Sequence, residues 1–169
     1  MKLDKSVITI SFTGEINEEN YFIFEEELNK ARRMSKKVIL YFSTFGGEMI
    51  LSEQLIDIIN DYPFELEMRC FGYLFSAGLL IIAKLKKPII IDIQCVGLVH
   101  IPSIALESRN TKKKTGFETY MTENEDNFNG YYLRGIKHVL SEEELELVLN
   151  GEDVCLGKDR IDKIVKGDA

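Results

Sequence analysis

Histidine, cysteine and long hydrophobic runs are all scarce in this sequence of 169 residues. With two histidines, no HExxH pair and no paired-cysteine motif, neither a catalytic zinc site nor any other cofactor is expected. The three cysteines, Cys70, Cys95 and Cys155, are odd in number and widely spaced among apolar neighbours. Buried free thiols in a reducing compartment explain this pattern better than disulfides do.

No apolar stretch approaches the ~18 residues that a membrane-spanning helix requires. Charged residues (Lys2, Asp4 and Lys5) precede only a short expected strand, so neither a membrane span nor a secretion signal is expected. Acidic residues outnumber basic ones by 28 to 21, and a protein that neutralises phosphates needs the opposite balance. The sequence therefore predicts a cytoplasmic protein without a nucleic-acid or membrane partner. Its length suits one domain over residues 1–169.

Strand and helix patterns alternate over the first hundred residues. Runs of β-branched and aromatic residues predict strands, and amphipathic spacing predicts the helices between them. The expected strands are 7–12, 37–43, 66–71, 88–93 and 96–99, and the expected helices are 17–34, 50–62 and 77–85. The first helix would be capped by Asn17 and would turn Phe22, Phe24, Leu28 and Ala31 to the sheet. Near-continuous apolar strands favour an α/β fold of parallel, right-handed βαβ units.

The second half of the chain is less regular. Aromatic and aliphatic residues recur over 117–136 at near-helical spacing, with Gly130 and Gly135 between them. A helix of this kind packs poorly by itself, so we expect it to contact another subunit. The alternative is a frayed helix on the same domain. Ser141 and Glu144 match a capping box, and the elements expected from there on are a helix to 149, a strand at 154–156 and a terminal turn at 160–165.

The stretch 70–83 is the part of the sequence most suggestive of a site, because an apolar strand passes there through small residues into an apolar helix. Gly72 permits a tight turn, and Ser76 comes at the expected start of the helix. Unpaired N–H groups and the helix dipole at that position favour developing negative charge. Ser76 is therefore a candidate nucleophile. The alternative is that Ser76 only caps the helix.

A serine nucleophile requires a general base and N–H donors for the oxyanion. The polar surroundings of His138 are typical of a surface histidine. His100 follows an apolar strand and precedes Pro102, which restricts its loop, although a histidine in such a place often belongs to the core. Gly46 and Gly47 end another expected strand. Because sites in open α/β sheets lie at the carboxyl ends of the strands, these loops should converge.

Four motifs, in this order and spacing, resemble the Clp-type caseinolytic serine peptidases, the ClpP family. They are Phe12-Thr13-Gly14-Glu15-Ile16-Asn17, the stretch from Ile39 to Gly46-Gly47, Gly72-x-x-x-Ser76-x-Gly78, and Val99-His100-x-Pro102. The resemblance covers roughly residues 7–103 and returns at the closing Ile161-Asp162-Lys163-Ile164. It implies an α/β, crotonase-like fold of stacked βαβ units with a protruding handle helix in the region of about 104–140.

The resemblance also implies roles for single residues. Ser76 would be the nucleophile, His100 the general base, and the N–H groups of Gly47 and Ala77 the oxyanion hole. A peptide would lie by β-augmentation along the segment formed by Gly46, Glu48 and Met49. The implied reaction is hydrolysis of peptides or unfolded proteins through an acyl-enzyme, without a metal. The implied assembly is a homo-oligomeric chamber, two stacked heptameric rings joined by their handles.

The sequence departs from the family pattern near the substrate path. Thr44-Phe45 replaces serine-proline before the glycine pair, and Glu48 replaces the serine after it. An aromatic ring and a carboxylate therefore lie where the family has smaller groups, and the side-chain preference of this chain should differ. The segment before the first strand, which the family uses with its partner ATPase, is short here. An ATPase partner is thus an open alternative rather than the expectation, and a short, phage-type or stand-alone relative is favoured.

The third member of the triad has no clean match. Counting back from Leu156 places it near Asn150, which we favour slightly, with Asp153 as the alternative. An asparagine oxygen can accept the imidazole N–H, but only an aspartate supplies charge. Three functions remain open: an active serine endopeptidase, which we favour, a catalytically silent ring subunit, and a crotonase-like acyl-CoA enzyme in which the glycine amides polarise a thioester.

Overall fold

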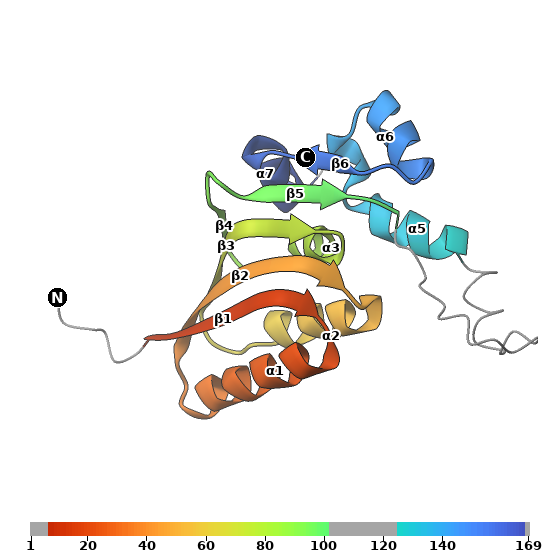
Figure 1. Cartoon of the computed structure of the whole chain (residues 1–169). Coiled ribbons are helices and arrows are strands. Elements are labelled where there is room, and N and C mark those ends of the chain that lie inside the picture. Colours follow the sequence, from red (N-terminus) through yellow and green to blue (C-terminus); the bar gives the residue numbers. More distant parts are fainter. Residues whose placement is uncertain (1–6, 102–124, 168–169) are drawn as a thin grey trace, which may run out of the picture.

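The computed structural model describes residues 7–101 and 125–167, and for residues 125–129 it describes the backbone alone. Within these residues, six strands form one sheet in the order β1-β2-β3-β5-β6, with β4 also paired to β3 (Figure 1). The strands are β1 Val7–Ile16, β2 Lys37–Gly47, β3 Leu66–Phe75, β4 Ile89–Ile91, β5 Val96–Val99 and β6 Val154–Leu156. The helices are α1 Glu18–Arg33, α2 Met49–Asn60, α3 Ala77–Lys84, α5 Glu125–Arg134, η1 Lys137–Val139, α6 Glu142–Leu149 and α7 Lys158–Lys166.

Strand β3 is the centre of the sheet. It pairs in parallel with β2 on one side, and on the other with β4 along its first half and with β5 along its second half. β1 is parallel to β2, and of the six described strands only β6 runs antiparallel to its neighbour, β5 (Figure 1). The predicted α/β fold with parallel βαβ units is therefore confirmed. The antiparallel direction of β6 was not predicted.

Strand β3 continues past the turn that the sequence predicts at Gly72. The chain bulges there instead. Between the pairs Phe42–Cys70 and Thr44–Leu74, β3 has two more residues than β2. Gly72 takes a φ of 62° in this bulge, a value that glycine adopts without a steric penalty. The Tyr73 N–H donates to Ser43 Oγ of β2 at 3.1 Å, which satisfies the displaced backbone. The bulge redirects β3 toward its end at Phe75, one residue before Ser76.

Helix α1 packs one face of its cylinder against the sheet. Asn17 caps it as predicted, since its side chain accepts the Asn20 N–H at 3.0 Å. The buried positions are Tyr21, Phe24, Leu28 and Ala31. The prediction that Phe22 faces the sheet is wrong, because Phe22 is 60% exposed. The three- and four-residue spacing of the buried set follows the helical period and leaves Phe22 on the outer side.

The opposite face of the sheet is open in the part of the chain that the structure describes. Side chains alternate along β3, so Cys70 and Leu74 are buried while Phe71 and Tyr73 are exposed. The exposed hydrophobic residues of this open face include Tyr41, Phe45, Phe71, Tyr73, Ile90 and Val96. Because parallel sheets are usually covered on both faces, an aromatic open face is suited to contact something outside the described chain.

The C-terminal elements are tied together around Arg160. The predicted capping box of α6 is confirmed, with Ser141 Oγ accepting the Glu144 N–H and the Glu144 carboxylate accepting the Ser141 N–H. Arg160 of α7 donates to Glu144 at 2.8 Å and to the Val139 carbonyl oxygen at 2.9 Å. Hydrogen bonds from Arg160 and from the Ser141 amide lower the pKa of Glu144 to about 2. These bonds fix α6, from which the chain enters β6.

Two of the three cysteines have the predicted burial. Cys70 and Cys95 are buried free thiols, whereas Cys155 is free but exposed, so the prediction of burial is wrong for Cys155. The alternation of β6 buries Val154 and Leu156 and turns Cys155 outward. Burial raises the pKa of Cys70, and burial together with Asp92 raises the pKa of Cys95 to about 11. Both buried thiols therefore remain protonated and unreactive.

The described part of the predicted handle region begins at α5, which packs on the end of α3. Lys84 Nζ lies 3.4 Å from the centre of the Tyr131 ring, and a Cβ added at Gly135 would lie 3.0 Å from Ala83 Cβ. Residues 102–124 lie outside the described residues, so the contact of the handle with another subunit stays a prediction. In the described ranges, no helix has the length and apolar character needed to cross a membrane.

Candidate active site

Ser76 lies at the junction of β3 and α3. It occupies the N-cap position, but its side chain makes no capping hydrogen bond. Its φ of 51° and ψ of −119° form a conformation that is costly for a residue with a Cβ. The Ser76 N–H donates to the Leu98 carbonyl oxygen of β5 at 2.9 Å, which anchors the turn. The helix therefore does not use the Ser76 hydroxyl, and the interpretation of Ser76 as a simple cap loses its support.

The glycine pair at the end of β2 lies against Ser76 and against β1. A Cβ added at Gly46 would lie 2.8 Å from Ser76 Cβ and 3.0 Å from the Phe75 carbonyl oxygen. A Cβ added at Gly47 would lie 2.2 Å from the Ile16 carbonyl oxygen. Both glycines also have positive φ, 89° and 146°. Only glycine fits at either position.

Thr44 holds this glycine pair in place. Its side chain is buried, and Oγ1 donates to the Gly14 carbonyl oxygen at 2.7 Å and accepts the Gly46 N–H at 3.0 Å. The Thr44 methyl group would lie 2.5 Å from a Cβ at Gly78 of α3. One side chain thus connects β1, the glycine pair and the helix that follows Ser76. The sequence showed Thr44 only as a departure from a family pattern, and its packing role could not be read from that pattern.

His100 and Asp153 are brought together by the pairing of β5 with β6. Val99 pairs with Val154 in the antiparallel register, so the next residues in register are His100 and Asp153. His100 Nδ1 lies 3.7 Å from Asp153 Oδ1, with the side chains 36% and 60% exposed. This separation fits an ion pair and exceeds an ordinary hydrogen bond. The two groups therefore need a small movement to form the hydrogen bond of a catalytic pair.

Asn150, the favoured third member in the sequence, lies three residues earlier at the end of α6. It is exposed, and its N–H donates to the Glu146 carbonyl oxygen at 3.0 Å. Among the described residues, the structure records a contact of His100 with Asp153 and none with Asn150. The sequence predicts both short strands correctly, but only their antiparallel register reveals that Asp153 is opposite His100.

The carboxyl ends of β2, β3 and β5 lie along one edge of the sheet (Figure 1). Phe75 pairs with Leu98. Ser76 therefore comes directly after β3, and His100 comes directly after β5, two residues past Leu98. The glycine pair ends β2 on the other side of β3. Three loops from separate parts of the sequence thus share one edge of the sheet, where parallel α/β proteins place their sites.

The remaining site residues predicted from the sequence surround the glycine pair and Ser76. The Glu48 N–H donates to the Ile16 carbonyl oxygen at 2.9 Å, toward β1. Ala77 is the first residue of α3, where N–H groups have no intrahelical partner. Glu48 is exposed, and Met49 begins α2, so the extended backbone ends beside Gly47.

Tyr132 of α5 supports the His100 segment from inside. It is fully buried, and burial raises the pKa of its hydroxyl while the backbone of His100 opposes the rise. The second histidine, His138, lies in η1, where its Nε2 is 3.4 Å from the Lys163 carbonyl oxygen. His138 therefore belongs to the packing of η1 on α7, and His100 is the histidine at the carboxyl edge of the sheet.

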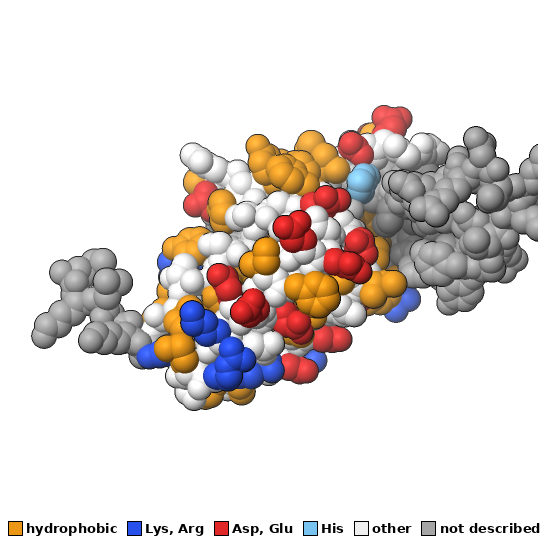
Figure 2. All heavy atoms as spheres, turned by 60° about the horizontal axis from the view of Figure 1, so that its bottom comes forward, with side chains coloured by type: hydrophobic (Ala, Val, Ile, Leu, Met, Phe, Trp, Pro, Cys, Tyr) orange, Lys and Arg blue, Asp and Glu red, His pale blue; other side chains and the backbone are white. Residues whose placement is uncertain are grey.

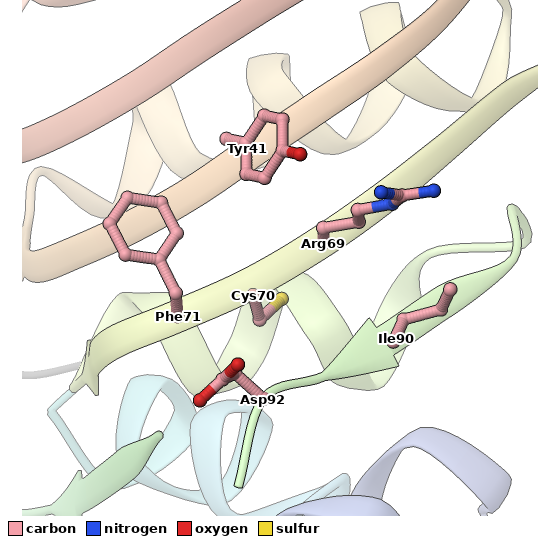
Figure 3. Close-up of a pocket in the computed structure, with 6 residues that line it drawn as sticks. All are labelled: Tyr41, Arg69, Cys70, Phe71, Ile90 and Asp92. Atoms are coloured by element: carbon pink, nitrogen blue, oxygen red, sulfur yellow. The ribbon is translucent and has the colours of Figure 1, made fainter. Parts of the chain in front are cut away.

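A separate pocket of about 520 Å³ lies on the open face of the sheet (Figure 3). It is lined by Tyr41, Arg69, Cys70, Phe71, Ile90 and Asp92. Arg69 Nε pairs with Glu67 Oε1 at 2.7 Å and the guanidinium carbon lies 6.0 Å from the centre of the Tyr41 ring. The pocket is at the middle of β3, and Ser76 does not line it.

Comparison with family models and with curated proteins finds no match to this sequence. Among solved structures, the chain is similar to a mutant of ClpP1 from Listeria monocytogenes, with a TM-score of 0.68 and 15% sequence identity. The alignment covers 92% of this chain and 86% of that chain. The chain therefore has the ClpP fold, as the sequence motifs predicted. At this identity the likeness establishes the fold alone.

The contact between Gly46 and Ser76 can be tested with two glycine substitutions. Gly46→Ala should unfold more easily than the native protein because it adds both a clash with Ser76 and backbone strain. Gly151→Ala is the matched control, since Gly151 has a similar φ of 87° and open space around it. We expect a loss of about 1 kcal/mol for Gly151→Ala and about 1–3 kcal/mol more for Gly46→Ala, measured by urea unfolding. Equal losses in the two variants would contradict the close packing of Gly46 on Ser76.

Proposed function

We propose that the protein is a serine endopeptidase of the ClpP kind that hydrolyses peptides or unfolded proteins. The observation that carries this proposal is the placement of Ser76 in a strained, uncapped turn beside the strand that presents His100 opposite Asp153. A strained strand-to-helix turn exposes a serine hydroxyl in other hydrolases as well. A core or capping role explains neither the strain at Ser76 nor the histidine–carboxylate pair next to it.

In the proposed reaction, Ser76 Oγ attacks the carbonyl carbon of the scissile peptide bond while His100 Nε2 takes the hydroxyl proton. The N–H groups of Gly47 and Ala77 donate to the oxyanion that forms. Asp153 accepts a hydrogen bond from His100 Nδ1 and stabilises the imidazolium. His100 then gives the proton to the leaving amine, and a water molecule hydrolyses the resulting ester on Ser76 by the same route in reverse.

Two variants test the first step. Ser76→Ala should abolish hydrolysis of short fluorogenic peptides, because no other group forms the acyl-enzyme. His100→Ala should lose activity to a similar extent, and the double variant should be no worse than either single one, since the residues act as a unit. Initial rates for all three proteins, with circular dichroism to check folding, provide the measurement. Native turnover by folded Ser76→Ala protein would disprove the peptidase proposal.

A second pair of variants identifies the third member of the triad. Asp153→Asn removes the charge beside His100 and keeps the size of the side chain, so turnover should fall at least tenfold. In a buried Ser-His-Asp triad, the same substitution lowers turnover about 10⁴-fold. Asn150→Ala is the control and should leave turnover within about twofold, because no contact joins Asn150 to His100 in the described residues. A large loss in Asn150→Ala combined with a silent Asp153→Asn would reverse the assignment.

The protein is also proposed to be a cytoplasmic homo-oligomer, and the ClpP resemblance points to stacked heptameric rings. The middle of the open sheet face, around Tyr41 and Ile90, is one apolar surface, and the exposed Phe22 and Ile23 of α1 belong to another. Near the middle of the face that Figure 2 shows, acidic side chains surround the hydrophobic ones. Contact between two different surfaces of one chain is head-to-tail, and such contacts form a ring when the rotation between subunits closes.

Light scattering at micromolar concentrations tests the assembly. The expected mass is a multiple of the 19.4 kDa chain, and Phe22→Glu should reduce it by placing a charge in an apolar contact. The control is Glu26→Gln on the same helix. A mass of one chain at every concentration would contradict the oligomer. A ring without any peptidase activity would favour the silent-subunit alternative.

A further inference from the structure

Three aromatic rings form a cluster on the open face of the sheet, at the end of β2 and β3. The ring centres of Phe45 and Tyr73 are 5.1 Å apart and stacked, those of Tyr73 and Phe75 are 5.1 Å apart, and those of Phe45 and Phe75 are 5.9 Å apart. These spacings are those of favourable aromatic pairs. We call these three residues the aromatic cluster. Mutual packing fixes the rings although Phe45 remains 58% and Tyr73 46% exposed.

The aromatic cluster is joined directly to the candidate catalytic turn. Phe45 immediately precedes Gly46, and Phe75 immediately precedes Ser76. The close packing of Gly46 on Ser76 brings these two backbones together, and the ring centres of Phe45 and Phe75 are 5.9 Å apart. A peptide whose scissile carbonyl lay at Ser76 would therefore pass close to the two backbones that carry these rings.

The aromatic cluster also shares a sheet face with the candidate base. Side chains alternate between the two faces along β5 and into His100. Gly97 and Val99 are buried, and the residues on the open side are Val96, Leu98 and His100. Tyr73 pairs with Val96 and Phe75 with Leu98. Side chains paired across neighbouring strands point to the same face. The open face therefore runs without interruption from the aromatic cluster to the His100–Asp153 pair.

We propose that the aromatic cluster is a specificity subsite that selects substrates with an aromatic side chain close to the scissile bond. This inference rests on the proposed peptidase function. A substrate ring would add to the existing stack in an offset or edge-to-face arrangement, burying the exposed faces of Phe45 and Tyr73. The cluster carries no formal charge, so a charged side chain at the same substrate position would lose hydration without a partner.

The expected discrimination follows from the size of the buried contact. One methylene group in an apolar pocket changes kcat/KM by about tenfold or more, and a phenyl ring offers more contact area than a methylene. Peptides with Phe beside the scissile bond should therefore be cleaved with a kcat/KM at least tenfold higher than matched peptides with Ala. Matched peptides with Glu or Lys should be no better than the Ala peptide.

The experiment compares kcat/KM for paired Phe and Ala peptides in four variants. Phe45→Ala and Tyr73→Ala should lower the Phe/Ala ratio of kcat/KM by about tenfold. Tyr73→Phe should retain the ratio because it keeps the ring. Phe71→Ala is the matched control: Phe71 lies on the same strand and the same open face but outside the aromatic cluster, and its loss should leave the ratio unchanged.

Two results would overturn the proposal. The first is an unchanged Phe/Ala ratio in active Phe45→Ala and Tyr73→Ala proteins. The second is an equal loss for both peptides together with a smaller mass by light scattering, which would make the aromatic cluster a contact between subunits.

A binding measurement separates this inference from the peptidase proposal. Fluorescence anisotropy of labelled Phe and Ala peptides on Ser76→Ala protein needs no turnover. Preferential binding of the Phe peptide that is lost in Ser76→Ala/Phe45→Ala would support the subsite even if the native protein hydrolysed nothing. Equal binding of the two peptides would reject the subsite even if the native protein were an active peptidase.

Discussion

The close approach of Gly46 to Ser76 is the constraint on which the rest of the site depends. No side chain fits between the end of β2 and the turn that leads into α3, because a Cβ at Gly46 would lie 2.8 Å from that of Ser76. Thr44 stabilises this approach with two hydrogen bonds: its Oγ1 accepts the Gly46 N–H and donates to the Gly14 carbonyl oxygen. The serine is thus held in a conformation that an isolated chain would rarely populate. Strain of this kind persists where the surrounding structure enforces it, and here the surroundings include two glycines and a buried threonine.

The other half of the site depends on elements distant in sequence. β6 is only three residues long, yet its antiparallel pairing with β5 sets Asp153 opposite His100. The position of β6 depends in turn on α6, which Arg160 ties to α7 and to η1. The fully buried Tyr132 lies against the His100 backbone. The helices at the C-terminal end therefore position His100 and Asp153, while the first βαβ units position Ser76 and the glycine pair.

Most of the fold could be predicted from the sequence, because alternating apolar strands and amphipathic helices are local patterns. The strand at 96–99, the cap at Asn17 and the capping box at Ser141 all follow from neighbouring residues, and the structure confirms them. Phe22 was misplaced because several helical faces through an aromatic-rich α1 look equally apolar. The contact of Asp153 with His100 could not be read from the sequence, because counting along the chain ignores register, which is a property of two strands. The role of Thr44 and the aromatic cluster were missed for the same reason, since both arise from contacts between segments far apart in sequence.

The central claim is that Ser76 is a nucleophile activated by His100, and covalent labelling tests it most directly. A fluorophosphonate reacts with an activated serine, and peptide mapping by mass spectrometry identifies the residue that carries the adduct. The account predicts a single adduct on the peptide that contains Ser76, formed in native protein and strongly reduced in His100→Ala. An adduct on a different serine, or complete absence of labelling in folded native protein, would contradict it.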